Sequence, residues 1–371
     1  MVRTETSALD LHFIVKELQL LVDGKVDKIY EQKEDKKSLL FRFHVPGKGK
    51  KQLKLLVPNF IYLTEFREQF PETPPGYCMF LRKRLDNARL RRIEQVGFER
   101  ILELEFEAKE QNYIMIVELF SQGNVILADK DYKIISPLEN KNWGVRTIRG
   151  GIKYEFPPKQ ADTSELDEKG FKEIFANTEK NLVKTLAVDL GLGGLYAEEL
   201  CIRAKLDKES KKLDDKHIKQ IYNEMKKMFT AVPSAVLYEN GELAPFALLH
   251  FKDMKMKSFS SFNEALDSEL SKNLEEAEIK SQEDVKKEKE DKIQLIITEQ
   301  EERIKGLEKS IDENHRKGEL IYEHYNDVKQ ILELLKQARE KYSWEEIKEK
   351  LKGHKIIKEI KEKEGQIILE L

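Results

Sequence analysis

Hydrophobic spacing over the first 60 residues predicts one helix followed by a β-hairpin. Apolar residues recur at helical intervals from Ser7 to Val22, and Ser7 and Asp10 have the spacing of a capping box. Apolar and polar residues then alternate in two runs, 39–45 and 53–57, joined by a loop rich in glycine and lysine. Alternation of this kind is typical of strands that bury one face. The chain is therefore expected to begin with a capped helix and an antiparallel strand pair.

A second strand-rich stretch extends from Ile93 to Leu138. It contains four short apolar runs separated by polar turns such as Gln122–Asn124, which predicts a β-meander. Upstream, a proline-rich break at 71–76 precedes a short helix, 79–85, whose exposed face carries Arg82, Lys83 and Arg84. Residues 1–160 are therefore predicted to form one β-rich domain with helices.

Helical periodicity dominates the chain beyond residue 160. The segment 171–230 looks like a helix-hairpin-helix domain, because two helical stretches flank the tight turn Gly191–Gly194. A short β-like insert is expected at 231–260. The fold class predicted up to this point is α+β.

A long coiled-coil arm is predicted for residues 261–371. Ser261 and Glu264 form a second capping box, and no proline follows before Lys341. From Ile293 to Leu335 seam positions recur in alternating steps of four and three, the heptad register of a left-handed coiled coil, and all are apolar except Gln300, Asn314 and Gly318. Such a seam needs a partner helix. Residues 355–371 are expected to be a charged tail in which the heptad does not return.

Charge and cysteine content narrow the class of protein. Lys and Arg (66) nearly balance Asp and Glu (69), so any nucleic-acid contact must come from local basic patches. The two cysteines, Cys78 and Cys201, are far apart, and the first residues lack the apolar run of a signal peptide. No segment of about 18 apolar residues occurs, so no membrane contact is expected. A cytoplasmic protein is predicted.

Catalytic and metal-binding patterns are not found in the sequence. The seven histidines share no metal-ligand spacing with one another or with the cysteines. No convergent Ser/His/Asp set and no phosphate-binding GxxxxGK[ST] motif can be placed. We therefore expect no enzyme activity, no cofactor and no metal site.

Arginine is concentrated in the first domain, and guanidinium groups both fork onto phosphates and stack on unpaired bases. The alternative is a solvated face in which these residues pair with Asp and Glu. The candidate RNA contacts are Arg82, Lys83, Arg84, Arg91, Arg92, Arg100, Arg146 and Arg149.

The turn containing Gly191, Gly193 and Gly194 could present free helix amides to a backbone phosphate, or it could serve packing alone. Glu198 and Glu199 follow where a phosphate-binding hairpin would carry positive charge, so repulsion is expected to weaken that contact.

Several motifs in order resemble the NFACT proteins, a family that includes bacterial RqcH, eukaryotic NEMF and archaeal relatives once labelled fibronectin-binding proteins. The resemblance covers essentially the whole chain and suggests an archaeal-type member. It implies a first domain related in fold to the MutM/Nei DNA glycosylases. A later NFACT-R domain and the returning half of the arm are expected to be absent from these 371 residues. The matching segments are Asp27–Tyr30, Pro74–Lys83, Glu94–Ile101, Glu118–Leu127 and Arg146–Pro158, followed by the hairpin and the coiled coil.

The resemblance also implies a function in ribosome-associated quality control. Members bind an obstructed large ribosomal subunit that holds a peptidyl-tRNA nascent chain, and recruit tRNA for C-terminal tailing without messenger RNA. An acidic–Arg pair that contacts tRNA in the family matches Glu99 and Arg100. The usual acid is Asp, so Glu99 leaves open which tRNA is preferred. A homodimer through the coiled coil is a further option.

Two other functions compete with this interpretation. One is a DNA- or RNA-binding protein of glycosylase-like fold without excision activity, since Met1 is followed by Val2 rather than by the nucleophilic proline of those enzymes. The other is a fibronectin-binding surface adhesin, which conflicts with the missing signal peptide and the low cysteine content.

Overall fold

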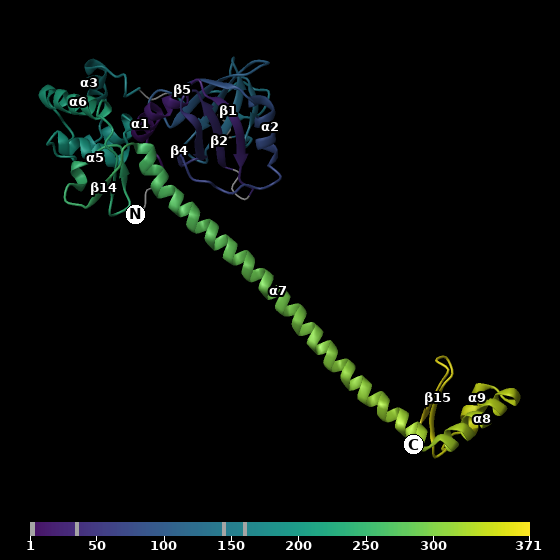
Figure 1. Cartoon of the computed structure of the whole chain (residues 1–371). Coiled ribbons are helices and arrows are strands. Elements are labelled where there is room, and N and C mark those ends of the chain that lie inside the picture. Colours follow the sequence, from purple (N-terminus) through teal and green to yellow (C-terminus); the bar gives the residue numbers. More distant parts are fainter. Residues whose placement is uncertain (1–3, 34–36, 143–145, 159–161) are drawn as a thin grey trace. The chain divides into compact units, whose positions relative to one another are not determined.

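A computed structural model describes residues 4–33, 37–142, 146–158 and 162–371, which cluster into two compact units, residues 1–277 and 278–371 (Figure 1). The first unit contains a large sheet, a group of helices and the first turns of a long helix. The second contains the remainder of that helix, two further helices and a small hairpin. The predicted α+β class is confirmed.

Within the described residues, nine strands form one antiparallel sheet in the order β4-β3-β2-β1-β5-β6-β7-β8-β9. The predicted hairpin is β2–β3, and the predicted meander is β6–β9. The strands are β1 (Lys25–Glu31), β2 (Ser38–Val45), β3 (Gly49–Leu56), β4 (Phe60–Thr64), β5 (Arg89–Gln95), β6 (Ile101–Glu107), β7 (Asn112–Glu118), β8 (Asn124–Asp129) and β9 (Ile134–Pro137). A two-residue pair, β10 (Lys141–Asn142) and β11 (Thr147–Ile148), stands apart from the sheet.

Helix α2 (Gly76–Leu85) packs against β1. This contact brings together two of the sequence motifs, Pro74–Lys83 and Asp27–Tyr30. Among the described residues β1 and β5 pair only at Lys25 and Arg89, so most of that edge of β1 lacks a strand partner. Side chains of α2 reach it instead: Cys78 Sγ and Arg82 Nε both donate to the carbonyl of Ile29, at 3.2 and 2.7 Å. The helix thereby supplies hydrogen-bond donors to a carbonyl of β1 at the part of this edge where no strand pairs.

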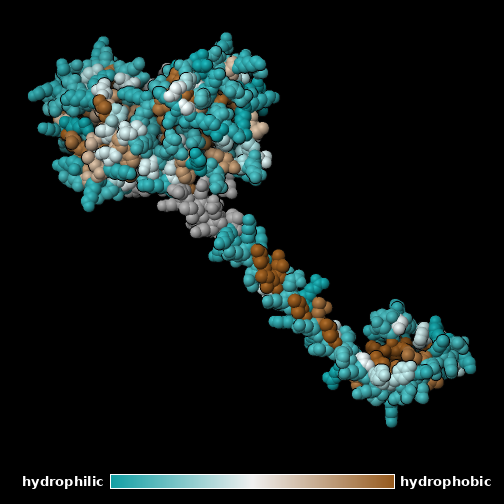
Figure 2. Space-filling model, viewed as in Figure 1, coloured by the Kyte–Doolittle hydropathy of each residue, from teal (hydrophilic) through white to brown (hydrophobic). Residues whose placement is uncertain are grey.

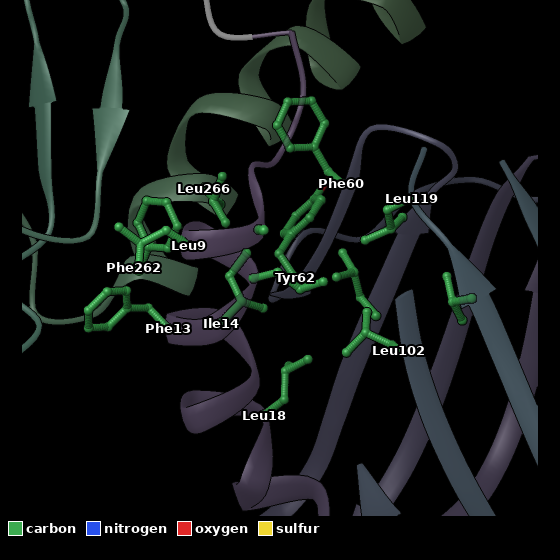
Figure 3. Close-up of a cluster of buried hydrophobic side chains, with 14 of the residues drawn as sticks. Leu9, Phe13, Ile14, Leu18, Phe60, Tyr62, Leu102, Leu119, Phe262 and Leu266 are labelled. Atoms are coloured by element: carbon green, nitrogen blue, oxygen red, sulfur yellow. The ribbon is translucent and has the colours of Figure 1, made fainter. Parts of the chain in front are cut away.

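Helix α1 (Ala8–Leu18), continued by η1 (Gln19–Leu21), lies at the centre of the hydrophobic core. Its N-terminus has the predicted capping box, since Asp10 N donates to Ser7 Oγ and Ser7 N donates to Asp10 Oδ2. Figure 3 shows its apolar side chains between the sheet and the start of the long helix. The buried residues labelled there are Leu9, Phe13, Ile14, Leu18, Phe60, Tyr62, Leu102, Leu119, Phe262 and Leu266.

The helical segment predicted at 171–230 ends at Phe229. It comprises α3 (Glu168–Ala176), α4 (Leu182–Lys184), the π-helical turn η2 (Thr185–Asp189), α5 (Gly193–Arg203) and α6 (Asp215–Phe229). The β-like insert is a three-stranded sheet of β12 (Val236–Tyr238), β13 (Leu243–Ala244) and β14 (Met256–Ser258), with η3 (Leu249–Phe251) between β13 and β14.

The long helix α7 (Phe262–Glu323) begins inside the first unit. Glu17 of α1 accepts hydrogen bonds from the backbone amides of Phe262 and Asn263, at 2.7 and 2.8 Å. In turn, Asn263 Oδ1 and Asp267 Oδ2 accept from the amides of Leu63 and Glu65, at 2.8 and 3.0 Å. The first turns of α7 therefore occupy hydrogen-bonding groups along β4 and just past its end, at the edge of the nine-stranded sheet.

The predicted capping box of α7 forms only in part. Glu264 N donates to Ser261 Oγ at 3.0 Å, and the carboxylate of Glu264 accepts mainly from Ser260, with a weaker contribution from the backbone of Ser261.

In the second unit, α7 is followed by α8 (Tyr325–Lys341), α9 (Trp344–Lys350) and a hairpin, β15 (Ile357–Lys361) with β16 (Gln366–Leu369). Residues 355–371 thus contain two strands where a charged tail was predicted. Every third residue of β15 is buried, and its apolar groups join a small core of Ile331, Leu335, Ile347, Ile357 and Ile360.

The predicted apolar seam of α7 lies on its surface (Figure 2). Ile293, Ile304 and Ile311 are 57%, 54% and 65% exposed. A heptad seam this exposed has no described partner in the chain. None of the described helices has both the length and the apolar content needed to cross a membrane.

Candidate nucleic-acid interface

Glu99 and Arg100 lie in the turn between β5 and β6. Gly97 adopts φ of +55°, and Glu99 N donates to Val96 O at 3.2 Å, which closes the turn. Arg100 Nη1 donates to Glu5 Oε2 at 2.6 Å and contacts the carbonyl of Thr6 at 3.4 Å. The turn is thus bound to the segment that precedes α1, and Arg100 keeps 26% of its side chain exposed.

A cavity of about 160 Å³ opens beside Glu99. Apolar and aromatic groups line it together with two carboxylates, those of Glu99 and Asp162. Unpaired RNA bases are held by such aromatic and hydrogen-bonding surroundings. The other lining residues are Val96, Gly97, Phe98, Ile101, Phe156 and Pro157.

The glycine turn between η2 and α5 is a neighbour of this cavity. Thr163, next to Asp162 in the chain, donates from Oγ1 to the carbonyl of Leu190 at 2.8 Å. Gly191 and Gly193 adopt φ of +65° and +74°, a backbone conformation that disfavours any side chain. Residues 162 and 163 therefore link the two turns, since Asp162 lines the cavity beside Glu99 and Thr163 bonds the residue before the glycine turn.

The N-terminus of α5 is open to solvent. A Cβ added at Gly193 or Gly194 would meet no described atom within 4 Å, and no described side chain caps the first amides of the helix. Such amides attract anions through their partial positive charge.

The two glutamates of α5 are already paired within the fold. Glu199 is fully buried and accepts from Arg203 Nε at 2.6 Å and from the amides of Leu249 and His250, both at 2.9 Å. Glu198 pairs with Lys208 at 2.9 Å. The repulsion that the sequence suggested for this hairpin is therefore smaller than two unpaired carboxylates would give.

Arg91 and Arg92 are engaged with acidic residues of the same sheet. Arg92 contacts Glu94, Glu105 and Glu103, and its hydrogen bond to Glu94 raises the pKa of Arg92. Burial raises the pKa of Glu103. Arg91 bonds Glu107 and Asp23. This arrangement matches the solvated, paired face considered as the alternative.

Arg146 has a mainly structural environment. Its side chain is 12% exposed, and its guanidinium donates to Glu118 at 2.5 Å and lies 4.8 Å from the ring of Tyr154. Tyr154 also donates to Glu118, and burial raises the pKa of that phenol. Arg149 by contrast is exposed.

The basic residues of α2 lie elsewhere. Arg84 lies 3.8 Å from Glu110, and Lys83 is exposed. Arg82 lies 5.5 Å from the ring of Tyr30, beside Lys28 and Arg42, residues that were not predicted as contacts. The nine predicted charged site residues therefore occupy several surfaces rather than one. Among the described residues, no group of three or more His, Cys, Asp or Glu side chains could hold a metal ion.

Comparison with known proteins gives a consistent relationship. A family model described as NFACT N-terminal and middle domains matches residues 7–364. The chain is 33% identical to the archaeal Rqc2 homolog aRqcH of Methanocaldococcus jannaschii, covering 100% of this chain and 58% of that protein. It is 27% identical to the Rqc2 homolog RqcH of Bacillus subtilis, covering 82% of this chain and 55% of that protein.

Identity to the ribosome quality control complex subunit NEMF of Homo sapiens is 24%, covering 93% of this chain and 35% of that protein. The chain therefore spans less than two thirds of the length of each of these relatives.

Solved structures show the same fold for the first part of the chain. The N-terminal region of the fibronectin/fibrinogen-binding protein from Streptococcus suis superposes with a TM-score of 0.61 over 72% of this chain and all of that one, at 23% identity. The fibrinogen binding protein from Staphylococcus aureus gives a TM-score of 0.59 over 70% of this chain and 97% of that one, also at 23% identity. At this level of identity the likeness concerns the fold alone.

Proposed function

Because the chain belongs to the NFACT family over residues 7–364, we propose that it is a cytoplasmic ribosome quality-control factor that binds the large ribosomal subunit and recruits tRNA. Relatives named as ribosome quality control subunits or their homologs support the general assignment. The finer proposal is that the obstructed subunit still holds a peptidyl-tRNA, and that recruited tRNA extends the stalled nascent chain without messenger RNA. The protein itself is proposed to be non-catalytic.

The observation that carries the tRNA assignment is the position of Arg100. Its side chain is 26% exposed and comes from the same turn as the cavity residue Glu99, and Thr163, next to the cavity residue Asp162 in the chain, bonds the residue that precedes the glycine turn of α5. A guanidinium, a base-sized recess with carboxylate acceptors and free helix amides are the groups that bind phosphates and unpaired bases. The glycosylase-like first domain implied by the resemblance and the helix-hairpin-helix domain indicated by the glycine turn stay predictions.

Substitution of Arg100 tests this assignment. Arg100→Gln is expected to lower tRNA recovery about tenfold in a pull-down on obstructed large subunits, because the positive charge and the bidentate hydrogen-bonding geometry of the guanidinium are both lost. Arg100→Lys should give an intermediate loss. Binding to the subunit itself should persist.

Arg303→Gln, an equal loss of charge at an exposed position of α7, is the matched control and should leave tRNA recovery unchanged. Wild-type tRNA recovery by Arg100→Gln would contradict the assignment.

A further inference from the structure

Positive side chains from β1, β2 and α2 also gather around one aromatic ring, that of Tyr30 on β1. The Lys28 ammonium lies 5.4 Å from the centroid of the Tyr30 ring, and the guanidinium carbons of Arg42 and Arg82 lie 5.7 and 5.5 Å from it. Lys50 of β3 adjoins the group through Asp27. We refer to Lys28, Tyr30, Arg42, Lys50 and Arg82 as the Tyr30 cluster.

The ring at the centre of the cluster is held in place by packing. Tyr30 stacks on Phe70 with centroids 4.8 Å apart and planes inclined by 27°. The ammonium of Lys54 lies 5.5 Å from the Phe70 ring and forms a buried ion pair with Glu68. Gln32 bonds both Glu68 and the carbonyl of Gln69, which fixes the segment that carries Phe70. The ring that the cations surround is thus preorganised.

The cluster carries more positive than negative charge. The Asp27 carboxylate accepts a hydrogen bond from Arg42 Nε at 2.6 Å and lies 3.8 Å from Lys50 Nζ, so a single carboxylate pairs with two cations. Glu68 is already paired with Lys54. Lys28 is exposed, and Lys50 keeps 66% of its side chain exposed. Cations held close together repel one another, and an anion placed among them lowers that repulsion.

We propose that the Tyr30 cluster binds the phosphodiester backbone of a folded RNA, at a surface separate from the Glu99–Arg100 turn. Lys and Arg neutralise backbone phosphates regardless of base sequence. The Tyr30 ring supports the cations and is stacked on Phe70, so recognition is through charge rather than through base stacking. The inference extends the proposed function, since tRNA and ribosomal RNA present the same phosphodiester chemistry.

The test uses the full chain with both exposed lysines neutralised, Lys28→Gln/Lys50→Gln. Binding to bulk tRNA and to protein-free large-subunit RNA is titrated between about 50 and 200 mM salt. The slope of log affinity against log salt should fall by about two, because each phosphate contact contributes about one. Affinity at a fixed salt concentration should fall about tenfold.

The matched control is Lys130→Gln/Lys133→Gln in the β8–β9 turn, which removes the same charge from exposed positions and should behave as wild type. Lys28→Arg/Lys50→Arg should retain the wild-type slope, and Lys28→Glu/Lys50→Glu should bind more weakly than the Gln pair. A loss confined to tRNA identifies tRNA as the occupant, and a loss confined to ribosomal RNA identifies the subunit. Both outcomes support the proposal.

Wild-type slopes for the Gln and Glu pairs with both RNAs would overturn it. Arg100→Gln is titrated in parallel. If that variant retains tRNA while the Lys28 and Lys50 variants lose RNA, the tRNA site at Arg100 fails and the Tyr30 cluster stands.

Discussion

If Arg100 binds tRNA as proposed, Glu5 is the carboxylate that an RNA phosphate would displace from it. The pair is close, at 2.6 Å, but Glu5 keeps 59% of its side chain exposed, so water and ions compete for it. Exposed ion pairs contribute little to stability. The contact therefore holds the guanidinium in position at low cost to RNA binding.

Glu5→Gln removes this competitor without removing the cation. We expect tRNA affinity to rise about threefold, since the free energy of an exposed pair no longer opposes the phosphate contact. Equilibrium binding at constant salt measures the change. Arg100→Gln combined with Glu5→Gln should show no gain, and a gain in that double variant would separate Glu5 from Arg100.

Residue-level chemistry was only partly accessible from the sequence. Glu99 and Arg100 could be proposed as a pair because they lie within a recognisable motif. Glu5 could not, because it lies 95 residues from its partner in the chain and no local pattern joins them. Lys28 and Arg42 were likewise missed as contacts, since the ring that gathers them becomes their common neighbour only when β1 pairs with β2.

At the scale of elements, a buried ion pair joins the outer strand β3 to the segment that follows β4. Lys54 of β3 is 1% exposed and its partner Glu68 is 6% exposed. Lys54 also donates to Ser38 Oγ at 2.8 Å, and Glu68 accepts from Gln32. This lysine occupies a polar position of the predicted alternation, between Leu53 and Leu55, yet its side chain lies in the interior.

Lys54→Met should destabilise the first unit by about 3 to 5 kcal/mol, because Glu68 is left buried without its cation. The variant Lys54→Met/Glu68→Leu should recover most of that loss, since both charges are gone. Calorimetric unfolding of the three proteins measures the effect. Equal destabilisation by the single and double variants would show that packing, rather than charge, determines stability here.

Elements with strong periodicity were predictable, and those dominated by charge were not. The capped helix from Ser7, the β2–β3 hairpin and the meander follow the spacing of apolar residues. In β15 the buried residues Ile357 and Ile360 are separated by exposed charged ones, so the segment has no simple strand alternation. Its hairpin becomes favourable only because the helices α8 and α9 supply the other half of a small core.

For the whole molecule, the exposed seam of α7 has the strongest consequence for assembly. Exposed Ile residues repeated at heptad spacing favour pairing with another helix. The 371-residue chain is therefore expected to self-associate with increasing concentration, as sedimentation velocity would show. Ile304→Glu/Ile311→Glu should abolish the association while the first unit unfolds at its usual temperature. A monomer at all concentrations for the wild-type chain would exclude this pairing.

The contacts of Asn263 and Asp267 with the β4 edge also determine where a stable fragment of the first unit can end. In a fragment that stops at residue 261, the amides of Leu63 and Glu65 would lose these acceptors. Unpaired strand edges recruit strands from other molecules. Such a fragment should form edge-to-edge oligomers in size-exclusion chromatography, whereas one ending at residue 277 should not. The first turns of α7 thus prevent the β4 edge from pairing with a strand of another molecule.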